Sequence, residues 1–286
     1  MVILHEERAV AEAAFAAAFA ELAMVERVMS IYRPEGELSR LNRAGTLEQP
    51  HAYLVQVLQA AQAMSERSGG AFDVTVQPLW DLFLAEQKKG RLPGDAAIEA
   101  ARRKVNWRRL EVTAQRVRLL DQGMAVTLNG IAQGFAADRA LAALQGHGIR
   151  HALVNSGELG SLGGKEGGEP WKTGIQHPRR PDAFAAVLDL DGRCLSTSGD
   201  YATAFSPDFV NNHIFDPATG RSPELLSSVS VLTPSCTEAD ALSTAIFVAG
   251  LERGMKLAES TPRTDAFLIR KDGTTLATKG FPISES

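Results

Sequence analysis

Apolar positions recur at helical spacing in five segments of the chain. Over residues 6–29 Ala, Leu, Met and Glu are frequent, no Gly or Pro interrupts, and Ser30-Ile-Tyr-Arg-Pro34 ends the run. A second amphipathic segment at residues 53–68 stops at Gly69-Gly70, a common signal for the C-terminus of a helix. The pattern predicts helices over these two segments and over three more, at residues 96–104, 130–145 and 237–248.

Alternating apolar and polar positions predict strands between and after the later helices. Residues 110–128 alternate on both sides of Asp121-Gln-Gly123, which predicts antiparallel hairpins that include 125–128. Further strands are predicted at residues 152–155, 185–190 and 228–232, and a hairpin at 266–278 that turns at Asp272-Gly273. Residues 156–168 are rich in glycine and are predicted to form a loop.

Helices that cluster early, with antiparallel strands flanking two later helices, favour an α+β fold over a doubly wound parallel sheet. Pro and Gly are dispersed and no internal repeat is visible, so residues 1–286 are predicted to form a single domain. No strand is predicted before the first helix.

Composition places the chain among ordinary globular proteins and excludes several classes of partner. Hydrophobic residues make up 44% and charged residues 22% of 286 residues. The net charge is −4 and no basic run occurs, so nucleic acid is not an expected partner. The longest uncharged run of the first helix, residues 13–20, is far shorter than the roughly 18 apolar residues of a membrane span. The first eight residues, MVILHEER, lack the charge pattern and cleavage site of a signal peptide.

The chain has two cysteines, Cys194 and Cys236. A lone pair 42 positions apart is neither a zinc signature nor a disulfide scaffold. We expect two unpaired thiols in the core or in strands rather than one disulfide, because free cysteine is among the most buried residue types. The redox state of the compartment is therefore left open.

The first segment with possible chemistry is TLNGIAQGF, residues 127–135. A strand leads there into a helix whose first turn contains Gly130 and Gly134. Free N–H groups at a helix N-terminus suit a phosphate group, and glycine allows a ligand to approach the backbone closely. The spacings of a Walker loop and of a dinucleotide fingerprint are absent. The alternative is that Asn129 caps the helix and that the two glycines serve packing.

The second segment is TEADALSTA, residues 237–245. Asp240 and Thr244 are four residues apart and share one helix face. A carboxylate and a hydroxyl offer hard oxygen ligands of the kind that Mg²⁺ prefers. The alternative is local, because Thr237-x-x-Asp240 also matches a capping box, in which Asp240 would only serve the helix N-terminus.

The third segment is GGAFDVTVQPLWDLF, residues 69–83. It places Phe72 and Trp80 close to Asp73 and Gln77, and aromatic rings with polar neighbours suit a flat heterocycle. The alternative is a strand and a helix that contribute to the core.

The fourth segment, NNHIFDPATG, carries His213 just before an Asp-Pro-x-Thr-Gly turn. With an unperturbed pKa of about 6.5, His213 could accept a proton at neutral pH. The alternative is a loop histidine that only bonds to its own turn.

Taken together and in this order, these motifs resemble the ApbE family of FAD:protein FMN transferases. The resemblance covers about residues 28–250 and is carried by MSIYRPEGELSRLN, SGGAFDVTVQPLW, LNGIAQGFAAD, WKTGIQHP, STSGDYATAF, HIFDPATG and SVSVLTPSCTEADALSTAIFVAG. It implies an α+β fold related to the tunnelling fold, FAD in an extended groove and Mg²⁺ at the pyrophosphate. It also implies transfer of FMN from FAD to a Thr or Ser of an acceptor protein, with release of AMP.

The resemblance also implies roles for individual residues. The family's catalytic histidine matches His213, and its metal ligands match Asp240, Thr244 and the backbone carbonyl of Ala132. Its flavin contacts match Tyr32, Ala71, Phe72, Asp73, Asn129, Gln133, Thr197 and Ile214. In this reading His213 takes the proton of the target hydroxyl, while Mg²⁺ neutralises charge on the phosphate oxygens.

The chain departs from the family pattern at three places. A strand bearing Met-Gly-Thr, usual in relatives, has no match before the first helix, so an edge strand is expected to be missing. Gln133 stands where many relatives carry Lys, which removes a positive charge near the phosphates. The segment NSGELGSLGG stands where relatives often show Asn-x-Gly-Gly-Asp, and Glu158 is a candidate for the role of that aspartate.

These observations predict an Mg²⁺-dependent flavin transferase that acts on an acceptor protein. One alternative uses the same pocket to hydrolyse FAD to FMN and AMP, with water in place of the target hydroxyl. Another is a non-enzymatic FAD carrier. An ordinary nucleotide oxidoreductase is disfavoured by the absence of a Rossmann fingerprint. The resemblance implies an exported, periplasmic protein whose leader is missing from the sequence, with a cytoplasmic form as the alternative.

Overall fold

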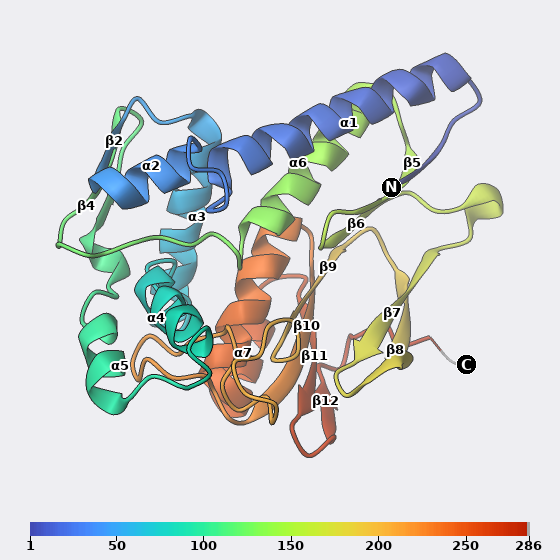
Figure 1. The fold of residues 1–286 in the computed structure, drawn as a ribbon. Coiled ribbons are helices and arrows are strands. Elements are labelled where there is room, and N and C mark those ends of the chain that lie inside the picture. Colours follow the sequence, from blue (N-terminus) through green and yellow to red (C-terminus); the bar gives the residue numbers. More distant parts are fainter. Residues whose placement is uncertain (285–286) are drawn as a thin grey trace.

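A seven-stranded antiparallel sheet runs through the computed structural model, which describes residues 1–284 (Figure 1). In spatial order its strands are β1 (Val2–Leu4), β5 (His151–Asn155), β6 (Leu159–Leu162), β9 (Cys194–Gly199), β10 (Leu226–Thr233), β11 (Asp265–Arg270) and β12 (Thr275–Ala277). Strands β7 (Trp171–His177) and β8 (Arg180–Leu190) form a separate hairpin, and β2 (Thr46–Glu48), β4 (Arg116–Leu119) and β3 (Leu110–Val112) form a small third sheet.

Seven α-helices within the described residues surround these sheets. They are α1 (Arg8–Met29), α2 (Glu37–Ala44), α3 (Ala52–Arg67), α4 (Gln77–Gln87), α5 (Asp95–Arg102), α6 (Ala132–Gly146) and α7 (Cys236–Glu259). Helix α7 is interrupted at Gly250, whose φ of 76° lies in the left-handed region, so its first four turns form one straight segment and its last turns another.

Both faces of the central sheet are covered. Helices α6 and α7 pack on one face, and α1 crosses over α6 as an outer layer (Figure 1). The β7–β8 hairpin packs on the other face, where its Trp171, Ile175 and Leu188 join Leu232 of β10 and Phe267 of β11 in one apolar cluster. Because β10 is covered on both sides, all eight of its residues are buried. The sheet therefore gives α6 and α7 a rigid base.

Most predicted helices and strands are confirmed. All five predicted helices are present with small shifts at their ends, although α7 extends past its predicted end at residue 248. The predicted strands at residues 152–155, 185–190 and 228–232 and the hairpin at Asp272-Gly273 are also present. The α+β class is therefore confirmed. The predicted loop at 156–168 contains the short strand β6, which the glycines of this segment obscured.

The predicted strand at residues 125–128 is wrong. Within residues 1–284 this segment forms only one isolated bridge, from Ala125 to Val76, with the Thr127 N–H donating to the Val74 carbonyl at 2.8 Å. Instead the side-chain amide of Asn42 acts as the partner: its Nδ2 donates to the carbonyl of Val126 at 2.8 Å and its Oδ1 accepts the Val126 N–H at 2.7 Å. This segment leads into α6, so Asn42 fixes the direction in which α6 begins.

The expectation that no strand precedes the first helix is also wrong. Val2, Ile3 and Leu4 pair with Leu153, Ala152 and His151 and form one edge of the central sheet. A run of three apolar residues is too short for a periodic pattern to reveal, and only its pairing with β5 defines it as a strand.

The expectation of two unpaired thiols is contradicted as well. Cys194 and Cys236 form a disulfide, with their Cα atoms 4.9 Å apart. Cys194 begins β9 and Cys236 begins α7, and the packing of α7 on β9 brings the two residues within bonding distance.

Within residues 1–284 no helix combines the length and the apolar character that crossing a bilayer demands.

Candidate active site

One pocket of about 750 Å³ brings the predicted site residues together. This volume is typical of small-molecule sites, which measure about 300–1,000 Å³. Its wall is formed by the end of α1, the loops around residues 71–76 and 127–133, the second half of β9, the segment 202–215 and the first part of α7. All twelve predicted residues line it: Tyr32, Ala71, Phe72, Asp73, Asn129, Ala132, Gln133, Thr197, His213, Ile214, Asp240 and Thr244.

Asp240 and Thr244 lie one turn apart on α7 and both face this pocket. The Asp240 side chain is buried, and its Oδ2 accepts the N–H of Gly134 at 2.9 Å. The Thr244 hydroxyl pairs with the Ser198 hydroxyl of β9 at 2.9 Å. The neighbouring strand and helix therefore hold both oxygen-bearing side chains in place.

The capping-box interpretation of Asp240 is wrong. The N-cap of α7 is Ser235, whose hydroxyl accepts the N–H of Glu238, and Thr237 bonds to Asp138 of α6. The local pattern Thr-x-x-Asp is present, but the N-cap residue lies two positions before Thr237. Asp240 consequently does not cap α7; its carboxylate instead accepts an N–H from the first turn of α6 and lines the pocket.

A second buried carboxylate, Glu158, lies close to Asp240 in the same pocket. Burial raises the pKa of Glu158, and the negative charge of Asp240 raises it further. Burial also raises the pKa of Asp240, although the Gly134 N–H opposes this. Two neighbouring carboxylates in a low-dielectric site repel one another, so the uptake of a proton or the binding of a cation beside Asp240 is favoured.

The charge of the pocket wall also favours the binding of a cation. Its acidic residues are Glu26, Asp73, Glu158 and Asp240, and among the described residues that line it there is no lysine or arginine. Among the described lining residues an anionic ligand therefore has no lysine or arginine side chain to pair with. The hard oxygens of Asp240 and Thr244, by contrast, fit Mg²⁺ well, since Mg²⁺ typically takes one or two carboxylates and completes its shell with water and phosphate oxygens.

The glycines before α6 serve packing and the position of Asp240. A Cβ atom on Gly134 would overlap the carbonyl oxygen of Cys236 and come within 2.8 Å of the Asp240 Cβ, so only glycine allows α6 and α7 to approach this closely. A Cβ atom on Gly130 would lie 3.0 Å from the Thr244 hydroxyl. The packing interpretation is thus confirmed for Gly134, and the N–H of Gly134 is engaged by a carboxylate. Asn129 is not the N-cap, because α6 begins after Ile131 without any side-chain cap.

Gly134→Ala is expected to destabilise the protein by about 3 kcal/mol, the upper part of the range for overpacking, because the added methyl group meets backbone atoms that cannot move aside. Thermal unfolding measures this. Gly146→Ala is the matched control, because Gly146 ends the same helix with nothing within 4 Å of its Cβ position. Equal melting temperatures for the two variants would contradict the packing role.

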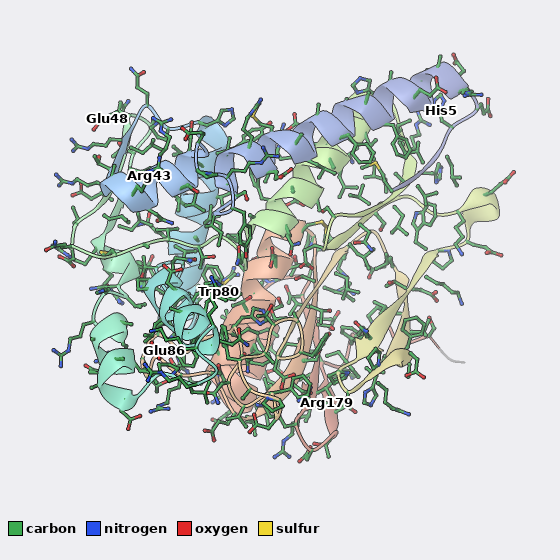
Figure 2. The ribbon with its side chains drawn as sticks, in the orientation of Figure 1. His5, Arg43, Glu48, Trp80, Glu86 and Arg179 are labelled. Atoms are coloured by element: carbon green, nitrogen blue, oxygen red, sulfur yellow. A yellow bond between two sulfur atoms is a disulfide. The ribbon has the colours of Figure 1, made fainter. Side chains whose placement is uncertain are left out.

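His213 is held with one ring nitrogen engaged. Its Nδ1 lies 3.2 Å from the carbonyl oxygen of Thr203, and its backbone N–H donates to the same oxygen at 3.0 Å. Because a carbonyl can only accept, Nδ1 carries the proton in the neutral ring, which leaves Nε2 free to accept one. Burial lowers the pKa of His213, so the ring is neutral at physiological pH. The Trp80 ring of α4 meets the imidazole edge to face, with centroids 6.0 Å apart; Figure 2 shows Trp80 near the centre of the molecule.

A network of polar groups fixes the segment around His213. Asn212 is fully buried, and its Oδ1 accepts the N–H of Ile214 at 3.0 Å while its backbone exchanges two hydrogen bonds with the Ser222 hydroxyl. Asp216 closes the predicted turn, since its carbonyl accepts the Gly220 N–H at 2.7 Å. The turn was visible in the sequence. The role of Asn212 was not, because its partner Ser222 lies ten residues away.

The predicted flavin-contact residues differ in exposure and in whether their polar groups already have partners in the fold. Phe72 and Ile214 are buried in the wall, and Tyr32 is 74% exposed at the end of α1. The carboxylate of Asp73 is already used by the fold: Oδ1 accepts the N–H and hydroxyl of Thr75, and Oδ2 accepts the Trp107 N–H at 3.0 Å. Burial raises the pKa of Asp73 in spite of these bonds. Asp73 therefore shapes this part of the wall by fixing its loop.

Two further predicted contacts are anchored by neighbours. The side-chain amide of Gln133 packs against Gly157, where an added Cβ atom would overlap the amide nitrogen. The Thr197 hydroxyl pairs with the Ser230 hydroxyl of β10 at 2.8 Å. Thr197 is thus pre-positioned on the pocket wall by a hydrogen bond, and Gln133 by packing alone.

Comparisons with known proteins agree on one family. The model of the ApbE family matches residues 2–268. A Vibrio cholerae protein described as FAD:protein FMN transferase is 33% identical over 253 residues, which are 85% of this chain and 75% of that protein. The solved ApbE protein of Thermotoga maritima superposes with a TM-score of 0.84 at 27% identity, covering 96% of this chain and 90% of its own. The flavinyl transferase ApbE of Pseudomonas stutzeri superposes with a TM-score of 0.81 at 31% identity, covering 94% and 87%.

Proposed function

We propose that this chain, which belongs to the ApbE family and transfers FMN from FAD to a protein, acts on a threonine or serine hydroxyl of the acceptor and releases AMP. In this proposal a divalent cation is bound by Asp240 and Thr244. One observation carries the proposal: the same pocket holds a histidine with a free Nε2 and a pair of helix-borne oxygen ligands. A base and a cation site in one cavity are components that attack on a phosphodiester requires.

The cation of this proposal is Mg²⁺, held by the Asp240 carboxylate, the Thr244 hydroxyl and the backbone carbonyl of Ala132. Bound there, Mg²⁺ would neutralise negative charge on the pyrophosphate oxygens of FAD. The acid-rich wall without lysine or arginine supports this, since the described residues offer the pyrophosphate no other positive charge. The Gly134 N–H and the Ser198 hydroxyl orient the two side chains.

His213 is the general base of this proposal. The hydroxyl oxygen of the acceptor forms a bond to the phosphorus of the FMN half, and the bond from that phosphorus to the bridging oxygen breaks. The hydroxyl proton goes to Nε2 of His213, and AMP leaves with the bridging oxygen. The Thr203 carbonyl holds the ring in the required tautomer. The edge-to-face contact with Trp80 limits rotation of the ring.

The protein is proposed to be exported and to act outside the cytoplasm. The Cys194–Cys236 disulfide supports it, because disulfides form and persist mainly in oxidising compartments.

The proposal is tested by incubating the protein with FAD, MgCl₂ and an acceptor protein, and by measuring AMP and the flavin fluorescence of the acceptor band after denaturing electrophoresis. We expect AMP and a fluorescent band only when the acceptor is present. An acceptor whose target hydroxyl residue is alanine is the matched control. AMP with free FMN and no acceptor would instead establish hydrolysis of FAD, and FAD binding without AMP release would establish a carrier.

A further inference from the structure

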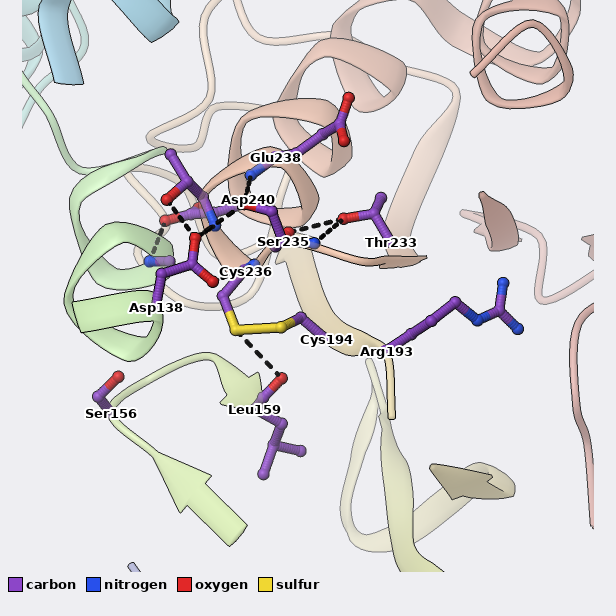
Figure 3. The surroundings of a disulfide bond; sticks show 12 residues. Asp138, Ser156, Leu159, Arg193, Cys194, Thr233, Ser235, Cys236, Glu238 and Asp240 are labelled. Atoms are coloured by element: carbon purple, nitrogen blue, oxygen red, sulfur yellow. Dashed lines mark hydrogen bonds between the residues drawn. A yellow bond between two sulfur atoms is a disulfide. The ribbon is translucent and has the colours of Figure 1, made fainter. Parts of the chain in front are cut away.

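A single carboxylate from α6 holds the first turn of α7. Asp138 accepts hydrogen bonds from the Ser235 hydroxyl at 2.8 Å, the Cys236 N–H at 2.8 Å, and the N–H and hydroxyl of Thr237 at 2.9 and 2.6 Å (Figure 3). The first N–H groups of a helix have no partner within the helix, and a negative charge beside them is favourable. Asp138 therefore caps α7 from a neighbouring helix, in addition to the Ser235 cap within the chain.

The disulfide ties the same turn to the sheet. Cys236 is the first residue of α7 and Cys194 the first residue of β9, and both side chains are buried (Figure 3). Strand β9 also carries Ser198, which contacts Thr244. The start of α7 is thus bonded covalently to the strand that holds one of the proposed cation ligands.

Asp138 and the disulfide both lie within one helical turn of residues of the proposed cation site. Asp240 lies one helical turn beyond Cys236, and Gly134 lies one turn before Asp138 on α6. Successive turns of α6 therefore contact α7 twice, once at Asp240 through the Gly134 N–H and once at the first turn through Asp138. A shift of the first turn would move Asp240 relative to Gly134 and to Thr244's partner Ser198.

We infer that Asp138 and the Cys194–Cys236 disulfide together form a clamp that positions Asp240 and Thr244 for the divalent cation. This inference rests on the proposed function, because it takes that cation site as given. Asp138 is in this sense a positioning residue: it contacts the helix that carries the ligands and not the ligands themselves. Groups that orient metal ligands typically change metal affinity by about 10–100-fold when they are removed.

The test is a calorimetric titration of the FAD-saturated protein with MgCl₂, alongside the rise in melting temperature that MgCl₂ produces. Asp138→Asn and the double variant Cys194→Ala/Cys236→Ala are each expected to weaken Mg²⁺ binding by about 10-fold or more. Thr237→Val is a milder variant that removes only the 2.6 Å bond to Asp138, and we expect a smaller loss in the same direction. Excess MgCl₂ is expected to restore AMP release to all three variants.

The control separates positioning from general loss of stability. Leu257→Ala removes buried side-chain atoms from α7 beyond the break at Gly250, far along the helix from the clamp. It is expected to lower the melting temperature while leaving the affinity for Mg²⁺ unchanged. Wild-type affinity in Asp138→Asn, in the double cysteine variant and in Thr237→Val would overturn the clamp but not the cation site. A wild-type protein that binds no Mg²⁺ would overturn the proposed cation site and the clamp with it.

Discussion

His213→Gln is expected to lower the rate of FMN transfer by about 10²–10⁴-fold, the usual worth of a general base, while FAD binding changes little. Glutamine keeps a polar side chain of similar length, but its amide cannot take a proton at neutral pH. The acceptor hydroxyl must then lose its proton to water. Single-turnover rates with saturating FAD and acceptor measure the effect.

The pH profile of the wild type identifies the group. Burial lowers the pKa of His213, so the neutral, active ring persists below its ordinary titration range, and the rate falls only when the pH drops through this lowered pKa. His213→Gln is expected to lose this acid limb. His147→Gln is the matched control, because His147 also bonds a backbone carbonyl through Nδ1, at 2.9 Å, but lies exposed at the end of α6. A full rate in His213→Gln would refute the role of His213 as a base.

Asp240→Asn is expected to reduce FMN transfer by about 10²–10³-fold, the loss typical when one group that stabilises transition-state charge is removed. Asparagine is nearly isosteric, so its side-chain oxygen can still accept the Gly134 N–H. The change also removes one of two neighbouring buried carboxylates. We therefore expect the cation-free variant to unfold at the same temperature as the wild type or at a higher one.

Loss of activity together with retained stability is the diagnostic combination. It is measured by AMP release over a wide range of MgCl₂ concentrations and by thermal unfolding without MgCl₂. Asp121→Asn changes the net charge equally, at an exposed residue paired with Arg109, and should leave both quantities near wild type. Transfer by Asp240→Asn with an unchanged dependence on MgCl₂ would exclude Asp240 as a ligand.

The site was predictable where function demands particular residue types within one short segment. Asp240 and Thr244 are separated by a single helical turn. His213 lies just before a turn that is predicted by its proline and glycine. These relationships are local, so motif and spacing suffice to find them. The capping interpretation of Asp240 failed because the start of α7 is set by Ser235 and by Asp138, and Asp138 lies 97 residues before Ser235 in the chain.

Several features that the sequence did not predict depend on distant partners. The Asn42 side chain takes the place of a strand partner for Val126, which lies 84 residues later in the chain. Strand β1 is a strand only because β5 lies beside it. The disulfide depends on the packing of α7 against β9, which no spacing between Cys194 and Cys236 encodes. Local periodicity reports which elements form, whereas these contacts depend on how the elements are arranged in space.

The acidic wall of the pocket makes FAD and the divalent cation linked ligands under the proposed function. The described lining residues include four carboxylates and no lysine or arginine, so the pyrophosphate and the cation each meet a more favourable charge when the other is present. By thermodynamic reciprocity each then raises the affinity for the other by the same factor. Occupancy of the site would follow the product of two concentrations, and the enzyme would respond more steeply when cation and FAD rise together than when either rises alone.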